Sequence, residues 1–378
     1  MIPETARCVK CGLCLAECPT YRVSANEAQS PRGRINLVQA LSEGQVEVDE
    51  RSFELLDSCL LCRRCEAICP SGVPFGSILD QGLSLVRAQR GISSRLLVMV
   101  LSRTTLTRWL FRVGKAVLPS FLGLGKLLNQ ARPDVAEFES LYRPPDEEPA
   151  GRVGLFVGCT GQWFDSDALE GAISLLLQAG YEVHIPRNQG CCGALDAHAG
   201  NSGRAQRLTA TNEAAFAASG DLDAILSIAS GCGAQLAVYK GIGPKHEDVA
   251  TFLASEAVMS RLRFKPLPKI AAVHIPCTLE NVLRGREGVL RLLDQVPGLQ
   301  IEVLGRKGAC CGAGGADFLL RRDRADQLRE PFAEQIDVFE PDYVLSGNVS
   351  CRLHLQAGAA NPEYLHPLTL LARQLIRG

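Results

Sequence analysis

The sequence lacks the features of an exported or membrane-spanning chain. Its first residues, MIPETARCVKCG, show no basic-then-apolar leader, and no run of about 18 consecutive apolar residues occurs. A net charge of −1, from 40 Lys plus Arg and 41 Asp plus Glu, argues against a general nucleic-acid binder. With 46% hydrophobic and 21% charged residues, the chain is too apolar to be disordered. We therefore expect a cytoplasmic protein of two or three domains.

Cysteine, in contrast, is abundant, with 16 residues. In a chain without an export signal, reduced thiolates that bind metal are expected rather than disulfides. The first eight form two runs with the spacing C-x2-C-x2-C-x3-C-P, which is typical of bacterial ferredoxins with two [4Fe–4S] clusters. The first run is Cys8, Cys11, Cys14 and Cys18, and the second is Cys59, Cys62, Cys65 and Cys69.

The spacing also predicts how these thiolates are shared between two clusters. Three thiolates spaced by two residues hold three corners of one cubane, and the fourth points to the other cluster. One cluster is therefore expected on Cys8, Cys11, Cys14 and Cys69, and the other on Cys59, Cys62, Cys65 and Cys18. A pair of zinc sites is the alternative, but zinc sites usually combine two CxxC pairs.

The other eight cysteines form an internal repeat with an offset of 118 to 119 residues. Each copy reads strand, helix, strand, Cys-Cys-Gly, helix, strand, Cys, with helices expected at 168–179 and 288–296 and short strands at 181–185 and 301–305. This alternation predicts an α/β fold with a largely parallel sheet, in which loops gather at one sheet edge. The first copy carries Cys159, Cys191, Cys192 and Cys232, and the second carries Cys277, Cys310, Cys311 and Cys351.

These repeat cysteines are predicted metal ligands. Adjacent thiolates rarely both suit one zinc ion but can reach different irons of a cluster, and the Gly after each pair lets the backbone turn tightly. We expect an iron–sulfur cluster in at least one copy. A vacant copy, a zinc site or purely structural cysteines remain the alternatives.

The chain outside the cysteines divides into four predicted regions. They are a helical ferredoxin-like domain (1–90), a basic helical linker (91–150), and the two Cys-Cys-Gly repeats (151–268 and 269–378). In the first region we expect a turn at 31–34 followed by a helix, a second helix carrying Phe53, Leu55 and Leu56, and a third from about 78 to 90. Arg32 and Arg34 either hold a loop near a cluster or partner, or lie solvated at the surface.

The segment 91–133 carries seven Lys or Arg residues and no Asp or Glu, interleaved with apolar residues and Trp109. We interpret it as a helix that packs against the α/β domain or a partner subunit. Peripheral contact with the cytoplasmic face of an anionic membrane is the alternative, and it would suit electron delivery to a quinone pool.

With these motifs the chain resembles the iron–sulfur subunits of flavin-linked oxidoreductases, a superfamily that includes glycolate oxidase, lactate utilisation proteins, anaerobic glycerol-3-phosphate dehydrogenase and heterodisulfide reductase. It most resembles the glycolate oxidase type, through C-x-x-C-G-x-C-x-x-x-C-P-T-Y at 8–21, P-R-G-R-I at 31–35 and C-L-x-C-R-x-C-E-x-x-C-P-S-G-V at 59–73. The resemblance implies two [4Fe–4S] clusters, one or two further clusters, and a partner flavin subunit that oxidises a 2-hydroxy acid and passes electrons toward quinone.

Two features bear on that implication. The chain has no G-x-G-x-x-G after a predicted strand, so no dinucleotide site is indicated and substrate chemistry is expected on a partner. In the heterodisulfide reductase type each repeat ends in C-x-x-C, whereas here Gln235 and His354 take the place of the last Cys. A four-Cys cluster, or one with His354 as a ligand at raised potential, remains open.

The positions of the remaining histidines give weaker indications of a functional role. His274, three residues before Cys277, either donates a hydrogen bond to a cluster sulfur, relays a proton, or is a structural residue at a strand end. His184, His198, His246 and His366 lack ligand spacing and are interpreted as structural. Two rival functions remain: a catalytic heterodisulfide-reductase-like subunit, and a docking platform whose repeats bind zinc or no metal.

Overall fold

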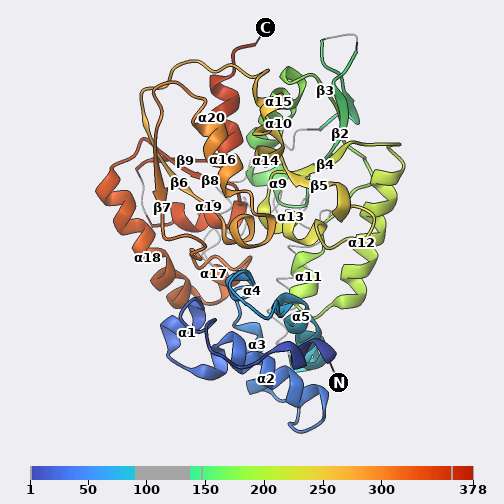
Figure 1. The fold of residues 1–378 in the computed structure, drawn as a ribbon, viewed down its shortest axis with the longest axis vertical. Helices are drawn as coiled ribbons and strands as arrows, with labels where there is room; N and C mark the ends of the chain where they lie inside the picture. Colours follow the sequence, from blue (N-terminus) through green and yellow to red (C-terminus); the bar gives the residue numbers. More distant parts are fainter. Residues whose placement is uncertain (1, 90–136, 146–147, 359–360, 378) are drawn as a thin grey trace, which may run out of the picture.

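The chain forms an N-terminal helical domain that lies against two α/β repeats (Figure 1). This computed structural model describes residues 2–89, 137–145, 148–358 and 361–377. The N-terminal domain lies at the bottom of the view in Figure 1, with the first repeat (green to yellow) and the second repeat (orange to red) side by side above it. The domain thus reaches both repeats.

Short helices build the N-terminal domain, as predicted from its sequence. They are η1 (Pro3–Arg7), α1 (Pro19–Ser24), η2 (Glu27–Gln29), α2 (Pro31–Ser42), α3 (Glu50–Asp57), α4 (Arg64–Ala67), α5 (Phe75–Val86) and η3 (Arg87–Gln89). Val38, Leu56, Ile78 and Leu83, from α2, α3 and α5, are almost fully buried together. The cysteine loops lie between these helices and are held by this core.

The turn predicted at 31–34 is wrong, because these residues form the first turn of α2. Ser30 caps the helix by accepting a hydrogen bond from the Gly33 amide at 3.0 Å, and Pro31 occupies the first helical position, where its missing N–H has no cost. The predicted helix around Phe53 is α3, which begins with a capping box between Asp49 and Ser52.

The first repeat contains a five-stranded sheet of order β1-β3-β2-β4-β5, in which only the pairing of β1 with β3 is antiparallel. Its strands are β1 (Leu141–Tyr142), β2 (Gly151–Phe156), β3 (Tyr181–His184), β4 (Ala224–Ser227) and β5 (His246–Asp248). Its helices are α9 (Gly161–Phe164), α10 (Ser166–Gln178), α11 (Ala194–His198), α12 (Ser202–Ala217), α13 (Ser230–Leu236), η4 (Gly243–Lys245), α14 (Val249–Leu253) and α15 (Glu256–Met259).

The second repeat contains a parallel four-stranded sheet of order β7-β6-β8-β9, which matches β3-β2-β4-β5 strand for strand. Its strands are β6 (Ile270–His274), β7 (Gln300–Leu304), β8 (Tyr343–Ser346) and β9 (Glu363–Leu365). Its helices are η5 (Leu279–Leu283), α16 (Arg286–Leu293), α17 (Asp317–Leu320), α18 (Arg322–Phe339), α19 (Val349–Gln356) and α20 (Pro367–Gln374). The predicted strand–helix alternation is therefore confirmed.

One hydrophobic core serves both repeats. It contains Leu155 and Leu176 of the first repeat together with Val273 and Leu371 of the second, all fully buried. Helix α10 packs closely on α20, and Gly171 permits this because a Cβ there would lie 2.8 Å from the Leu368 carbonyl oxygen. The repeats therefore share their interior.

Most of the predicted linker, including the whole segment 91–133, lies outside the described residues. The predicted domain borders at 90, 150 and 268 stay predictions. Within the described part of the chain, no helix combines the length and apolar character needed to cross a bilayer.

Candidate iron–sulfur centres

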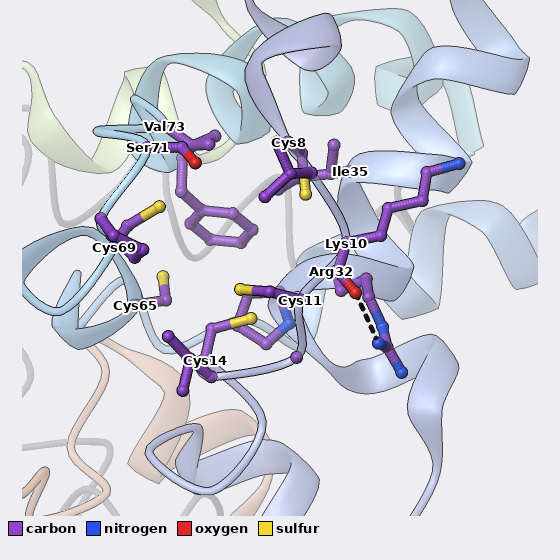
Figure 2. A pocket seen from close by; sticks show the side chains of 16 residues that line it. Cys8, Lys10, Cys11, Cys14, Arg32, Ile35, Cys65, Cys69, Ser71 and Val73 are labelled. Carbon is purple, nitrogen blue, oxygen red and sulfur yellow. Dashed lines mark hydrogen bonds between the residues drawn. The ribbon is translucent and has the colours of Figure 1, made fainter.

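The first cysteine group surrounds a cavity of about 460 Å³ in the N-terminal domain (Figure 2). Cys8, Cys11, Cys14 and Cys69 line it, as the spacing predicts, and Cys65 also reaches it. Cys11 is exposed to solvent. The structure therefore brings the predicted first ligand set together, close to the surface.

The second group lines a separate cavity of about 310 Å³ and contains Cys18, Cys59, Cys62 and Cys65. This group lies deeper, since Cys18 and Cys62 are buried. Burial raises the pKa values of Cys62 and Cys65 well above those of ordinary thiols. Four thiolates gathered at this depth need a strong positive charge among them, which a bound metal centre supplies.

The two cysteine loops share an unusual backbone. The residues just before the second cysteine of each run, Lys10 and Leu61, have φ near +58° and +52°. The residues just after it, Gly12 and Arg63, have φ of +84° and +53°. Left-handed backbone at three non-glycine positions is strained and is typical of sites where a ligand dictates the chain path. The two loops thus share the same left-handed backbone on both sides of their second cysteine.

Two arginines hold these loops. Arg32 donates a hydrogen bond to the Lys10 carbonyl at 2.9 Å and pairs with Glu27, so it fixes the first loop. Arg34 is 1% exposed, so a solvated surface position is wrong for it. Its guanidinium donates to neutral oxygens of Leu55, Thr20 and Ser58 at 2.8 to 3.1 Å. None of the carboxylates within the described ranges forms an ion pair with it.

The first repeat gathers its four predicted cysteines at the carboxyl ends of its strands. Cys159 follows β2, Cys191 and Cys192 follow β3, and Cys232 lies in the first turn of α13, after β4. Their sulfurs lie close enough to interact, since Cys191 interacts with both Cys159 and Cys192, and Cys192 also interacts with Cys232. The hydrogen bond from Cys159, then that from Cys192, holds the pKa of Cys191 well below its ordinary value.

The second repeat places its cysteines in the same way, but as two pairs. The Cys277 thiol donates to Cys310, and the Cys311 thiol donates to Cys351. The hydrogen bond from Cys277 lowers the pKa of Cys310, whereas that to Cys351 raises the pKa of Cys311. The four sulfurs lie close enough for their charges to interact across the pairs.

The Cys-Cys-Gly turns are alike in both repeats. The amide of Gly193 donates to the sulfur of Cys191 at 3.4 Å, and that of Gly312 donates to Cys310 at 3.5 Å. Gly312 has φ of +92°, and a Cβ there would lie 2.6 Å from the Ala325 carbonyl oxygen, so glycine is required. In each repeat the first sulfur of the pair is therefore the one best prepared to ionise.

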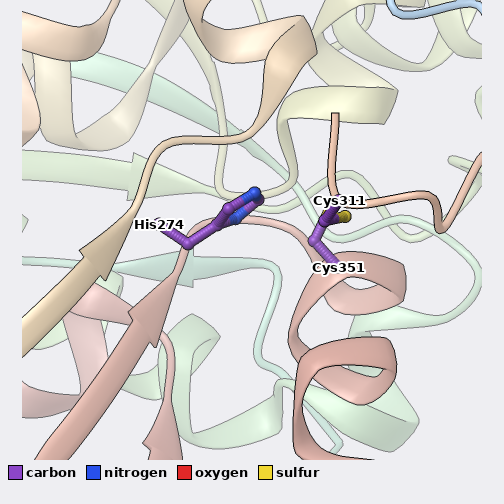
Figure 3. A group of neighbouring side chains, drawn as sticks. All are labelled: His274, Cys311 and Cys351. Atoms are coloured by element: carbon purple, nitrogen blue, oxygen red, sulfur yellow. The ribbon is translucent and has the colours of Figure 1, made fainter. Parts of the chain in front are cut away.

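One histidine joins the second repeat's sulfurs, and it is His274 rather than His354 (Figure 3). A nitrogen of His274 and the sulfurs of Cys311 and Cys351 all lie within 4.8 Å of one another. Burial lowers the pKa of His274 to about 4, so its imidazole is neutral. His354 instead faces backbone, with Nε2 3.0 Å from the Ala325 carbonyl oxygen. The geometry gives no support to His354 as a ligand.

The other histidines have structural partners, in line with their interpretation. His184 lies against Glu182, His198 pairs with Asp80 of the N-terminal domain at 3.1 Å, and His246 meets Ser227 at 3.0 Å. His366 caps α20 and contacts the Ile228 carbonyl oxygen at 3.0 Å.

The second ferredoxin-type group touches the second repeat. Cys62 and Cys310 belong to one buried cluster with Leu60, and their charges interact. Asn281 fixes this contact by donating to the Cys62 carbonyl at 2.8 Å. Ion pairs of Arg321 with Asp57 and of Arg306 with Glu17 surround it. The sequence gives no indication of this contact, because its members are more than 200 residues apart.

Comparison with known proteins gives the family. Residues 4–73 match the model of a 4Fe-4S dicluster domain, and residues 153–237 and 271–356 match that of a cysteine-rich domain. The glycolate oxidase iron-sulfur subunit of Escherichia coli strain K12 is 31% identical over 389 residues, spanning 97% of this chain and 93% of the relative. The chain belongs to the glycolate oxidase iron–sulfur subunit family.

Two further relatives of the chain come from other organisms. The probable glycolate oxidase iron-sulfur subunit of Bacillus subtilis strain 168 is 28% identical, over 94% of this chain and 89% of the relative. A fumarate reductase (CoM/CoB) subunit of Methanothermobacter marburgensis is 24% identical, over 92% of this chain and 67% of the relative. The predicted family, and the predicted pair of Cys-Cys-Gly domains, are confirmed.

Proposed function

We propose that this chain is the electron-transfer subunit of a flavin-linked 2-hydroxy-acid dehydrogenase or oxidase complex with glycolate as substrate. A partner flavin subunit would oxidise the substrate, and electrons would leave toward quinone. The observation that carries this proposal is the contact of Cys62 with Cys310. This contact places the proposed ligands of the second ferredoxin-type cluster next to those of the second repeat. Iron–sulfur clusters, when bound, carry single electrons between such neighbouring sites.

We assign the ligands as the spacing predicts, and the structure supports the assignment. The first cluster belongs on Cys8, Cys11, Cys14 and Cys69, and the second on Cys59, Cys62, Cys65 and Cys18; these sets line separate cavities. A further cluster in one or both repeats belongs on Cys159, Cys191, Cys192 and Cys232 and on Cys277, Cys310, Cys311 and Cys351. The matching strand orders of the two sheets support a pseudo-two-fold relation between the repeats.

The partner flavin subunit is proposed to dock over the first cysteine loop. Val9 is 69% exposed, Leu13 is 58% exposed, and Cys11 between them is also exposed. Apolar side chains at this exposure next to a redox ligand suit a protein contact that excludes water. The segment 91–133 lies outside the described residues, so its packing against the α/β domain or a partner stays a prediction, and peripheral contact with the cytoplasmic membrane face stays the alternative.

The test is cluster reduction by substrate in the reconstituted complex, followed by EPR under anaerobic conditions. Glycolate, lactate and glycerol 3-phosphate are compared as reductants. We expect glycolate to reduce the clusters faster than the other two. A complex whose clusters respond only to glycerol 3-phosphate, or to none of the three, would contradict the proposed substrate class.

The docking face is tested with Leu13→Glu in the same assay. We expect slower substrate-driven reduction with unchanged iron content and unchanged reduction by dithionite. Val338→Glu is the matched control, because Val338 is 78% exposed but lies in α18, away from the first cysteine loop. Equal reduction rates in both variants and the unmodified chain would overturn the docking assignment.

A second function is favoured by one observation, the relation to the fumarate reductase (CoM/CoB) subunit. In this alternative the repeat centres themselves reduce a heterodisulfide. The loss of the fifth cysteine of each repeat, at Gln235 and His354, argues against it. Heterodisulfide turnover by the isolated chain with a chemical reductant would support this alternative over the first proposal.

A further inference from the structure

His274 stands at the carboxyl end of β6 with its ring orientation fixed. Strand β6 pairs in parallel with β8, and this register places His274 opposite Ser346. The Ser346 hydroxyl lies 3.0 Å from Nδ1, and Ser346 is fully buried. Phe332 packs edge-on against the imidazole, with ring centroids 5.3 Å apart. One ring nitrogen is therefore committed to the protein, and the ring has little room to turn.

The other nitrogen, Nε2, has no hydrogen-bond partner within the described ranges, although His274 is only 1% exposed. A buried polar nitrogen without a partner is destabilising, because it has lost its hydrogen bonds to water. Such a group in a folded protein indicates a partner that the polypeptide itself does not supply. The nearby thiols of Cys311 and Cys351 are the groups that would share this partner.

The two repeats differ at this position. Counting back 118 residues, the offset between Cys277 and Cys159, Phe156 takes the place of His274 in the first repeat. Phe156 is buried next to Cys192 and Cys232 and offers no ligand atom. The second repeat thus adds a neutral nitrogen donor to its four sulfurs, whereas in the first repeat the phenyl ring of Phe156 fills the equivalent position.

We propose that Nε2 of His274 is a ligand, together with Cys311 and Cys351, to an iron of the cluster in the second repeat. This proposal rests on the proposed function in that it requires a cluster there. Bonds of about 2.0 to 2.3 Å to nitrogen and sulfur reach a common metal from atoms spaced like these after small side-chain rotations. The hydrogen bond to Ser346 at Nδ1 fixes the tautomer that leaves Nε2 as the ligand atom.

Histidine ligation would make the two repeat centres unequal. The second-repeat centre would have a neutral nitrogen donor in addition to four thiolates, whereas a centre on the first repeat would have thiolates alone. Because ligand identity tunes the reduction potential of a cluster, the two centres would differ in potential.

The decisive experiment needs no mutation of His274. The full chain is prepared anaerobically with 15N-labelled histidine and, separately, with natural histidine, and the reduced protein is studied by pulsed EPR. The second-repeat signal is identified as the one that is lost in Cys310→Ser. We expect this signal to show a strong 14N coupling that changes to the 15N pattern on labelling. A second-repeat signal without any histidine coupling would overturn the ligand assignment and leave the proposed function intact.

Two variants identify which of the six histidines is responsible. In His274→Asn the side-chain amide lies near the former Nδ1 position, so it can keep the contact with Ser346 but does not reach the sulfurs. We expect the coupling to disappear and the potential of this centre to change. His354→Asn is the control and is expected to keep the coupling. A coupling that survives in His274→Asn would refute the proposal, and so would the absence of any cluster in the second repeat. The proposed electron-transfer function would fail separately, if substrate reduced none of the clusters of the chain.

Discussion

Arg34 is a buried cation without a carboxylate partner in the described part of the chain, and this makes a quantitative prediction. Its guanidinium lines the cavity of the second cysteine group and donates to Thr20, whose hydroxyl lies 3.2 Å from the Cys18 sulfur. Its charge opposes the burial that raises the pKa of Cys59. Buried charges are normally paired. The negative charge of a four-thiolate cluster is the counter-charge that this position lacks.

Removing this charge should lower the reduction potential of the second cluster, because the reduced cluster is the more negative form. A unit charge on the order of 8 Å away, at an effective dielectric constant near 20, interacts by about 2 kcal/mol. For a one-electron couple this corresponds to roughly 90 mV. Arg34→Met should therefore lower the potential by about this amount, whereas Arg34→Lys should keep most of it because the charge remains.

The assay is an EPR-monitored redox titration of the full anaerobic chain, with the second-cluster signal identified by its loss in Cys62→Ser. Iron analysis confirms that each variant retains its clusters. Arg34→Lys loses the forked hydrogen bonds to Leu55 and Ser58, so it controls for lost structure at constant charge. A potential in Arg34→Met equal to that of the unmodified chain, or an equal shift in both variants, would refute the electrostatic role.

Three further predictions concern the repeat centres, the domain contact and pH. Cys310→Ser and Cys191→Ser should each remove the centre of a repeat that holds one and leave at least the roughly 8 irons of the two ferredoxin-type clusters; iron content equal to that of the unmodified chain in both variants would contradict the ligand assignments. Arg321→Ala removes an ion pair to Asp57 across the domain contact and should weaken docking by about 1 to 3 kcal/mol, seen as faster proteolysis of the N-terminal domain; unchanged cleavage would contradict this. Burial raises the pKa of Asp248 to about 7. Between about pH 4 and pH 7 this residue therefore binds more protons in the folded chain than in the unfolded chain. Its contribution makes the stability of the folded chain fall as pH rises through that window. Asp248→Asn should therefore raise Tm more at about pH 8 than at about pH 5, and equal changes at both would show that the carboxyl is not buried as described.

Local features were predictable from the sequence because their causes are local. Cysteine spacing by itself predicts two groups of four cysteines, and the structure gathers these groups around two cavities, with Cys65 lining both. The offset of the second repeat predicts the same strands and helices as the first, and the two sheets have matching orders. The turn predicted at 31–34 failed because Pro and Gly favour turns, but the cap at Ser30 and proline at the first position also begin a helix.

What the sequence left open depends on tertiary contacts. The position of His354, three residues after Cys351, suggested a ligand, but α19 turns that ring toward the Ala325 carbonyl. His274 joins the sulfurs because β6 and β8 pair in one particular register, which no short segment specifies. The burial of Arg34 likewise depends on acceptors 14 to 24 residues away along the chain. Ligand geometry at a shared sheet edge is thus decided by packing.

The shared core of the two repeats has a consequence for how the chain is made. Because α10 packs on α20, the part of α10 that α20 covers cannot be buried until α20, encoded far downstream, has left the ribosome. Apolar side chains of the first repeat would thus stay exposed to water while the second repeat is still being synthesised. The two repeats are therefore expected to fold in a single cooperative transition. A chain cut between the repeats would give two aggregation-prone fragments rather than two independently folded domains.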